Sequence, residues 1–304
     1  MKKYIKFILF IILIYFILKN SYLLIESIKL SFSLCINKLF PSLIPFMLLS
    51  NILVNYNFIN DISDFLNNIM VKIFKVNKNC SFVLIMSIIS GSPSNGKFLK
   101  DLLDKQLITT KDCQNCLNFI QYTNPLFVLG TIGYTFLNDK KLGLIILISS
   151  YLSSFILGIF NKNKNIYNYN KEINSKTDNL FSVLNKAIIS TINTLLLILG
   201  IITTFFILTS LLDSILNINE NYKFIYGLFE ITQGLNYLSI SNINIYLKTI
   251  ISSFLISFGG FCIHAQVFSI LDNKKIRYLP YFLSRLLHGF ISVVITFIFL
   301  KLYY

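Results

Sequence analysis

The chain has 304 residues, of which 55% are hydrophobic and only 13% are charged. This balance, with a mean hydropathy of +0.68, excludes a water-soluble globular domain of this size, so we predict an integral membrane protein. The formal net charge of +14 does not indicate nucleic-acid binding. The basic residues lie in short clusters between apolar runs, as they do in the cytoplasmic loops of membrane proteins.

The amino-terminal segment, residues 1–24, has a basic start followed by an apolar run over residues 4–18. No small-residue cleavage site follows this run, so we expect an uncleaved signal-anchor helix with its basic end in the cytoplasm. Residues 27–54 are long enough to span a bilayer but contain Pro41 and Pro45. Each proline bends a helix and frees a backbone carbonyl, which is tolerated at membrane depth only where neighbours or a cavity satisfy it.

Residues 80–90 form an apolar run of about half the length that a membrane span needs, and the run ends in the motif GSPSNGK. Amphipathic helices are predicted over residues 97–107 and 110–121, the second with Thr110 as its N-cap. Another half-length run, residues 125–137, starts within the motif TNPLF.

A full span is predicted over residues 142–160, and the polar stretch of residues 161–179 that follows is predicted to be a cytoplasmic linker. After it come a long apolar segment at residues 180–212 and a shorter one at residues 223–238 that carries the motif FEITQG. The next apolar run, residues 245–271, is interrupted by Gly259 and Gly260. The part on either side of these glycines is too short to span a bilayer alone, so we expect a hairpin or a broken helix. The last span starts at residue 278.

The two halves, residues 25–160 and 180–304, correspond in order. In each half we pair a segment with a helix-disturbing motif (FPSLIPF or FEITQG) and a half-length run broken by glycine (GSPSNGK or FGGFCIHAQ). Short interrupted segments at matching places in two halves are typical of secondary transporters with internal repeats. The predicted fold is therefore an all-α polytopic membrane protein with two pseudo-repeats, re-entrant hairpins and broken helices.

Helices that end inside a bilayer need polar partners for their free backbone groups. At the first break, glycines permit close backbone approach and a helix starting near Lys97 would direct its positive end and a cation at one point, which suits an anion. An ordinary turn between two short helices is the alternative. The predicted substrate-binding residues at this break and the next are Ser92, Ser94, Asn95, Gly96, Lys97 and Asn124.

At the second glycine break, Gly259 and Gly260 with His264 and Gln266 are predicted to line a cavity; the alternative is a helix-packing notch with satisfied core residues. Glu230 is predicted to be a coupling or gating acid, with Gln233 and Arg285 in the same coupling or gating group, unless its segment lies at the surface. Arg285 and His288 share one helix face, where they form either an anion contact or an interfacial pair.

We expect no enzyme activity, cofactor or metal site. Cys113 and Cys116 form one C-x-x-C pair without a second pair, and His264 and His288 are the only histidines. We therefore expect the five cysteines to be small buried helix residues.

The motifs LFPSLIPF, GSPSNGK, FEITQG and SFGGFCIHAQVFSIL, in this order, resemble those of the sporulation integral membrane proteins of the YlbJ type, also called SpoVV, which contain the nucleoside-recognition or Gate domain. The resemblance implies a protein in the membrane around the forespore that moves dipicolinic acid towards the spore. It also implies a plan similar to concentrative nucleoside carriers, with paired re-entrant hairpins and broken helices. The alternatives are a carrier of nucleosides or other small metabolites and a non-transporting scaffold. The expected partners are the small anion and the lipid bilayer, without nucleic acid, and a homo-oligomer is left open.

Overall fold

The computed structural model describes residues 11, 14–56, 58–160, 179–272 and 275–303, and within these residues it contains helices and no strand. Four stretches are long and apolar enough to cross a membrane, judged by length and composition. They are α8 (Lys140–Phe160), α9 (Leu180–Leu216), α11 (Ile245–Phe258) taken with α12 (Gly260–Leu271), and α13 (Tyr278–Tyr303). The prediction of an all-α polytopic membrane protein is confirmed. Most of the predicted signal anchor lies outside the described residues.

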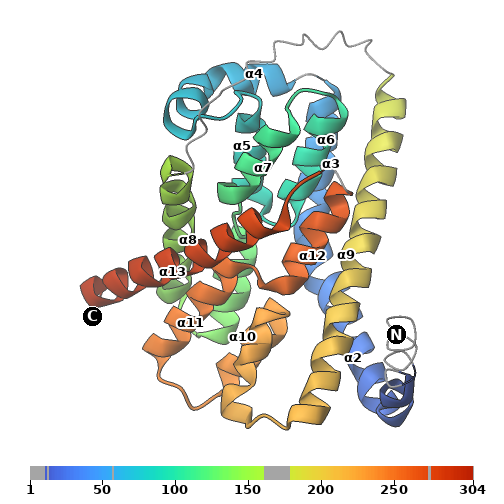
Figure 1. Cartoon of the computed structure of the whole chain (residues 1–304), viewed down its shortest axis with the longest axis vertical. Helices are drawn as coiled ribbons and strands as arrows, with labels where there is room; N and C mark the ends of the chain where they lie inside the picture. The colour runs from blue at the N-terminus through green and yellow to red at the C-terminus, as the bar shows by residue number, and fades with distance from the viewer. Residues whose placement is uncertain (1–10, 12–13, 57, 161–178, 273–274, 304) are drawn as a thin grey trace, which may run out of the picture.

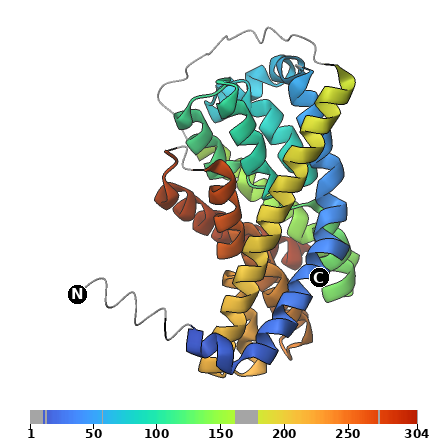
Figure 2. The same ribbon diagram turned by 90° about the vertical axis from the view of Figure 1, so that its right-hand side faces the viewer.

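The longest helix, α9, runs along one side of the molecule (Figure 1). Its 37 residues extend for about 55 Å, well beyond the roughly 30 Å of a bilayer core. Beside it lie α2 (Ser21–Leu34), the π-helical η1 (Cys35–Leu39) and α3 (Phe40–Asn55), as Figure 2 shows. Pro41 lies in the first turn of α3, where a missing N–H costs nothing, and Pro45 lies inside the helix.

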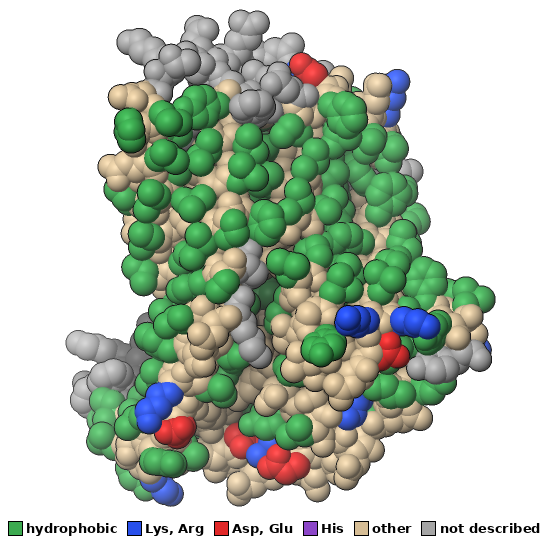
Figure 3. Space-filling view, turned by 180° about the vertical axis from the view of Figure 1, so that it is seen from behind, with side chains coloured by type: hydrophobic (Ala, Val, Ile, Leu, Met, Phe, Trp, Pro, Cys, Tyr) green, Lys and Arg blue, Asp and Glu red, His purple; other side chains and the backbone are tan. Residues whose placement is uncertain are grey.

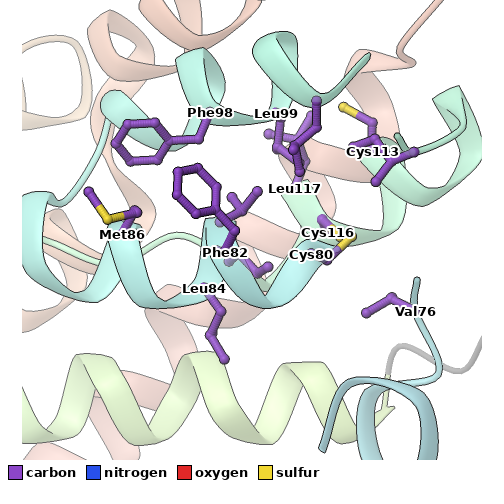
Figure 4. Packing of buried hydrophobic residues seen from close by; sticks show 14 of the residues in the cluster. Val76, Cys80, Phe82, Leu84, Met86, Phe98, Leu99, Cys113, Cys116 and Leu117 are labelled. Atoms are coloured by element: carbon purple, nitrogen blue, oxygen red, sulfur yellow. Dashed lines mark hydrogen bonds between the residues drawn. The ribbon is translucent and has the colours of Figure 1, made fainter. Parts of the chain in front are cut away.

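One end of the molecule is built from the helices that follow α3 in the chain (Figure 1). They are α4 (Phe58–Phe65), the π-helical η2 (Ile69–Phe74), α5 (Cys80–Ser90), α6 (Ser94–Asp104) and α7 (Thr110–Phe119). Between α5 and α6 the rings of Phe82 and Phe98 pack edge to face, with centroids 6.1 Å apart (Figure 4). All five cysteines are free and buried, as the sequence predicted. Cys80, Cys113 and Cys116 belong to the same hydrophobic cluster as Phe82 and Phe98. The N-cap of α7 is Thr109, not Thr110, because Thr109 and Asp112 form a capping box.

A second hairpin occupies the opposite end (Figure 1). It consists of the 3₁₀-helix η4 (Glu220–Leu228) and α10 (Ile231–Ile240), and the chain reverses at Phe229 and Glu230. Its arms touch at Gly227 and Gly234, where an added Cβ on Gly234 would lie 2.1 Å from the Gly227 Cα. The apolar segment predicted over residues 223–238 is thus a hairpin in the structure, because these glycines allow the arms to pack back on each other.

Two further elements are interrupted near the middle of the molecule. After α7 the chain is extended over residues 120–124 before the π-helical η3 (Phe127–Phe136) begins. Gly259 separates α11, which packs on α13, from α12, which packs on α6 and α9. Because the two pieces continue in different surroundings rather than folding on each other, the second predicted alternative, a broken helix, is correct.

Apolar side chains cover most of the face seen in Figure 3, and charged side chains gather towards its lower part. The end of α8 and the start of α9, which flank the linker, lie at the end of the molecule where α4 lies, whereas α2 starts at the opposite end (Figure 1). We had expected the amino-terminal segment and the linker on one side of the membrane. The linker and the basic end of the amino-terminal segment lie outside the described residues, so the side of the membrane on which each lies stays a prediction.

Candidate functional site

The tip of the α5–α6 hairpin is joined to the extended segment of residues 120–124. The Ser92 amide donates to the Tyr122 carbonyl at 2.8 Å. Gly91 has φ +75°, and a Cβ there would lie 2.3 Å from the Asn124 amide nitrogen, so only glycine fits. The Asn124 side chain donates to the Ser90 carbonyl at 3.2 Å and accepts from the Leu126 amide at 2.8 Å. The helix end at Ser90 is thus satisfied from the neighbouring break, as an end inside a membrane requires.

The second half repeats this relationship between a hairpin tip and the break that follows it. The Cys262 amide, in the first turn of α12, donates to the Phe229 carbonyl at the hairpin tip, at 2.8 Å. Gly260 has φ +58°, and an added Cβ would lie 3.2 Å from the Gly227 carbonyl oxygen. By position in the fold, GSPSNGK therefore compares with FEITQG, and TNPLF compares with FGGFCIHAQ. The pairing we expected from the sequence differs from this arrangement, because it matched a hairpin tip with a broken helix.

All of these breaks line one cavity of about 70 Å³. At roughly 10–15 Å³ for a water molecule it has room for several waters, and it is about half the size of a ~150 Å³ cavity that takes benzene. Apolar side chains of η1, α3, α9, α11 and α12 form much of the wall. The polar part consists of Ser92, Gln121, Tyr122, Thr123, Asn124, Glu230, Thr232, Cys262 and Gln266.

The polar groups of this wall include donors without a partner in the protein. The Ser92 hydroxyl and the Gln121 side-chain nitrogen, both buried, have no hydrogen-bond partner within the described part of the chain. Glu230 is 6% exposed, and its carboxylate caps α10 by accepting from the Gln233 amide at 2.7 Å. Among the described residues that line the cavity, Glu230 is the only carboxylate, and none is a lysine or arginine. The wall therefore suits a polar solute that presents acceptor oxygens to the free donors. The solute must also be compatible with the carboxylate of Glu230.

Several of the predicted binding residues do reach the cavity, and residues of both glycine breaks line it. These residues are Ser92, Asn124, Gly259, Gln266 and the predicted coupling acid Glu230. Gln266 donates to the Cys262 sulfur at 3.3 Å. Their positions agree with the sequence; their roles in binding stay predictions.

The remaining residues of the first motif lie behind the wall. Ser94 is buried, Asn95 donates to the Ile120 carbonyl at 2.8 Å, and Gly96 packs on Val267 of α12. Lys97 is paired with Asp101, one turn further along α6. The expectation that Lys97 supplies the ligand's positive charge is not met by its position, because α6 begins at Ser94 and places Lys97 beside its own acidic neighbour.

His264 also lies outside the wall. Its Nε2 is 2.9 Å from the Phe258 carbonyl, which can only accept, so Nε2 carries the proton. Nδ1 is then left to accept from the Tyr278 hydroxyl at 3.2 Å. His264 therefore satisfies the end of α11 instead of facing a ligand. Gln233 accepts from the Thr209 hydroxyl at 2.5 Å, which ties the second hairpin to α9.

Arg285 is fully buried, behind Gln121 and Tyr122. Its guanidinium donates to the Asn118 carbonyl at 2.7 Å and to His288 Nδ1 at 3.0 Å, and it lies over the ring of Tyr281. A guanidinium can only donate, so Nδ1 of His288 is an acceptor and Nε2 carries the proton that points to the Ser150 carbonyl. Neither predicted alternative, direct contact or an interfacial pair, describes this position.

Sequence reasoning missed Gln121, Tyr122 and Thr123, which we had assigned to the end of an amphipathic helix or left unassigned. The available signal was Pro125, since the residues before a proline avoid the helical region and Asn-Pro favours a turn. No group of three or more His, Cys, Asp or Glu side chains in the described part of the chain could hold a metal ion.

The comparisons with known proteins agree with the membrane fold. The chain is 28% identical over 308 residues to the "Sporulation integral membrane protein YlbJ" of Bacillus subtilis (strain 168), an alignment that covers 88% of this chain and 76% of that protein. No family model and no solved structure matches the chain. The nucleoside-recognition domain that the resemblance implied stays a prediction.

Proposed function

We propose that the chain, which is 28% identical to a sporulation integral membrane protein, carries a small anion, most simply dipicolinate, without chemical change across the membrane around the forespore. The observation that carries this proposal is the single cavity at which two hairpin tips and two helix breaks meet. Transporters with internal repeats bind their solutes at such interrupted helices near the middle of the membrane.

The wall chemistry supports an oxygen-rich solute. Ser92 and Gln121 offer donors that the protein does not use, and buried donors without partners are costly unless a ligand or water meets them. Arg285 adds a buried positive charge behind this part of the wall. The second half mirrors the first in its order of hairpin and broken helix, and the hairpins lie at opposite ends (Figure 1). This arrangement supports inverted repeats.

The cavity is too small for an aromatic dicarboxylate in the state described. A solute of that size requires one hairpin to move away from the break that it contacts, Gly91 from Asn124 or Phe229 from Cys262. Each contact rests on one backbone hydrogen bond and a glycine. On this proposal, the structure corresponds to a closed state of an alternating-access cycle.

Glu230 favours a second candidate. The Glu230 carboxylate repels a dianion unless the carboxylate is protonated. Hydroxyl and amide groups around one acid also suit a neutral nucleoside. Purified protein in liposomes, with either labelled dipicolinate or a labelled nucleoside outside, separates the two. Uptake of dipicolinate above that of protein-free liposomes, competed by unlabelled dipicolinate and not by nucleosides, is the expected result. Uptake of the nucleoside alone favours the second candidate, and uptake of neither solute favours a scaffold.

A further inference from the structure

The orientation of the Gln121 side chain is fixed by its surroundings. Asn95 Nδ2 faces the Ile120 carbonyl at 2.8 Å, which identifies this atom as the amide nitrogen, and the same nitrogen donates to Gln121 Oε1 at 3.2 Å. The Tyr281 hydroxyl donates to the same oxygen at 3.1 Å. Two donors therefore hold the oxygen, and the Gln121 amide nitrogen has to point the other way.

The Gln121 nitrogen points towards the cavity. Gln121 is 4% exposed and lines the wall, and its Nε2 would lie 3.7 Å from a Cβ built on Gly259. Because Gly259 has no side chain, the space in front of the nitrogen stays open. Among the described residues Nε2 has no hydrogen-bond partner, and neither has the hydroxyl of Ser92 in the same wall. Two buried donors of the cavity wall are thus left without an acceptor at hydrogen-bond distance.

A buried positive charge, Arg285, is linked to Gln121 through Tyr281. The Arg285 guanidinium carbon lies 5.6 Å from the centre of the Tyr281 ring, and the Tyr281 hydroxyl is the group that holds Gln121. Arg285 contacts a carbonyl, a neutral histidine and an aromatic ring, and it forms no ion pair with an acidic residue in the described ranges. A buried charge without a counter-charge is unfavourable, so this region favours an anion.

We propose that Gln121 is the carboxylate-recognising residue of the cavity. A carboxylate of the solute accepts from Gln121 Nε2 and the Ser92 hydroxyl, and Arg285 supplies the counter-charge from behind through Tyr281. Asn95 and Tyr281 are positioning residues, since they fix the amide that donates. The identity of this carboxylate as part of the transported solute rests on the proposed function; the direction of the Gln121 donor does not.

The test is the Gln121→Glu substitution, which keeps the shape and the oxygen held by Asn95 and Tyr281 but replaces the donor with an anionic acceptor. Dipicolinate binding to the purified protein, measured by calorimetry, should weaken at least tenfold, or 1.4 kcal/mol. Binding of the neutral diamide of the same acid should be retained or strengthened, because its N–H groups can donate to the new carboxylate. Gln106→Glu is the matched control, since it makes the same change at an exposed position.

The reversal of preference between the acid and its diamide is a result that a folding defect cannot produce. If Gln121→Glu does not fold, Ser92→Ala and Tyr281→Phe replace it, and each should weaken dipicolinate binding severalfold. Unchanged dipicolinate affinity in these variants, or no affinity in the wild type, overturns the assignment. Wild-type binding without uptake into liposomes overturns the proposed transport and leaves Gln121 as the carboxylate site.

Discussion

The backbone amide of Ser92 donates to the carbonyl of Tyr122 at 2.8 Å, and this bond joins two helix breaks that are distant in sequence. Tyr151 of α8 supports the junction from behind, because its hydroxyl lies 2.7 Å from the Ile88 carbonyl and 3.1 Å from the Thr123 carbonyl. Each broken helix thus satisfies its free carbonyls through the other break or through α8. The Ser92 hydroxyl and the Gln121 amide nitrogen in the cavity wall are left for a solute.

Gly91→Ala should destabilise the protein by at least about 2 kcal/mol, because φ +75° with ψ −178° is a region nearly confined to glycine and the new Cβ would meet the Asn124 amide at 2.3 Å. Thermal unfolding in detergent measures the change. Gly200→Ala is the control, since nothing lies within 4 Å of its Cβ and alanine favours a helix. The account is wrong if both variants unfold at the same temperature.

Asp213→Asn should loosen the second hairpin. Asp213 on α9 accepts from Lys223 at 2.9 Å and from the Tyr226 hydroxyl at 3.0 Å, and both donors belong to η4. Its carboxylate is partly shielded, so we expect a loss of about 1 kcal/mol. Glu220 is the other carboxylate near Lys223, and its side chain is well exposed. Glu220→Gln should therefore cost less than about 0.5 kcal/mol. Equal losses in denaturant unfolding would contradict a specific anchor at Asp213.

Glu230→Gln should remove the dependence of uptake on a proton gradient. A dianion next to Glu230 requires the carboxylate to take a proton, so wild-type uptake should rise when the outside is made acidic. Glutamine keeps the N-cap to Gln233 but cannot titrate. Uptake into liposomes at two outside pH values measures this, with the exposed Glu26→Gln as control. A variant that keeps the full pH response shows that Glu230 does not carry the proton.

The positions of the breaks could be predicted from the sequence to a large extent. The run before Gly91 and the runs around Gly259 are too short to span a bilayer, and this length argument is physical. The hairpin at Glu230 was not predicted, because its two arms together have the length and hydrophobicity of one segment. Its signal is the close pairing of Gly227 with Gly234, which a single sequence does not reveal.

The site was predicted less completely. Lys97 and His264 carry strong chemistry in the sequence, yet the fold gives each of them a local partner, Asp101 and the Phe258 carbonyl. Gln121 was missed because its role follows from Asn95 and Tyr281, which the fold brings to it from other helices. A side chain's local motif predicts which chemistry it can do, but the direction in which it points depends on long-range packing.

The most direct test of the cavity as the transport site is to fill it. Ile202 of α9 lines the cavity and is 4% exposed, whereas Ile192 of the same helix is 49% exposed on the outer surface. We predict that Ile202→Phe folds but takes up labelled dipicolinate into liposomes at least tenfold more slowly than the wild type, and that Ile192→Phe transports normally. Wild-type uptake by a folded Ile202→Phe protein would contradict the account.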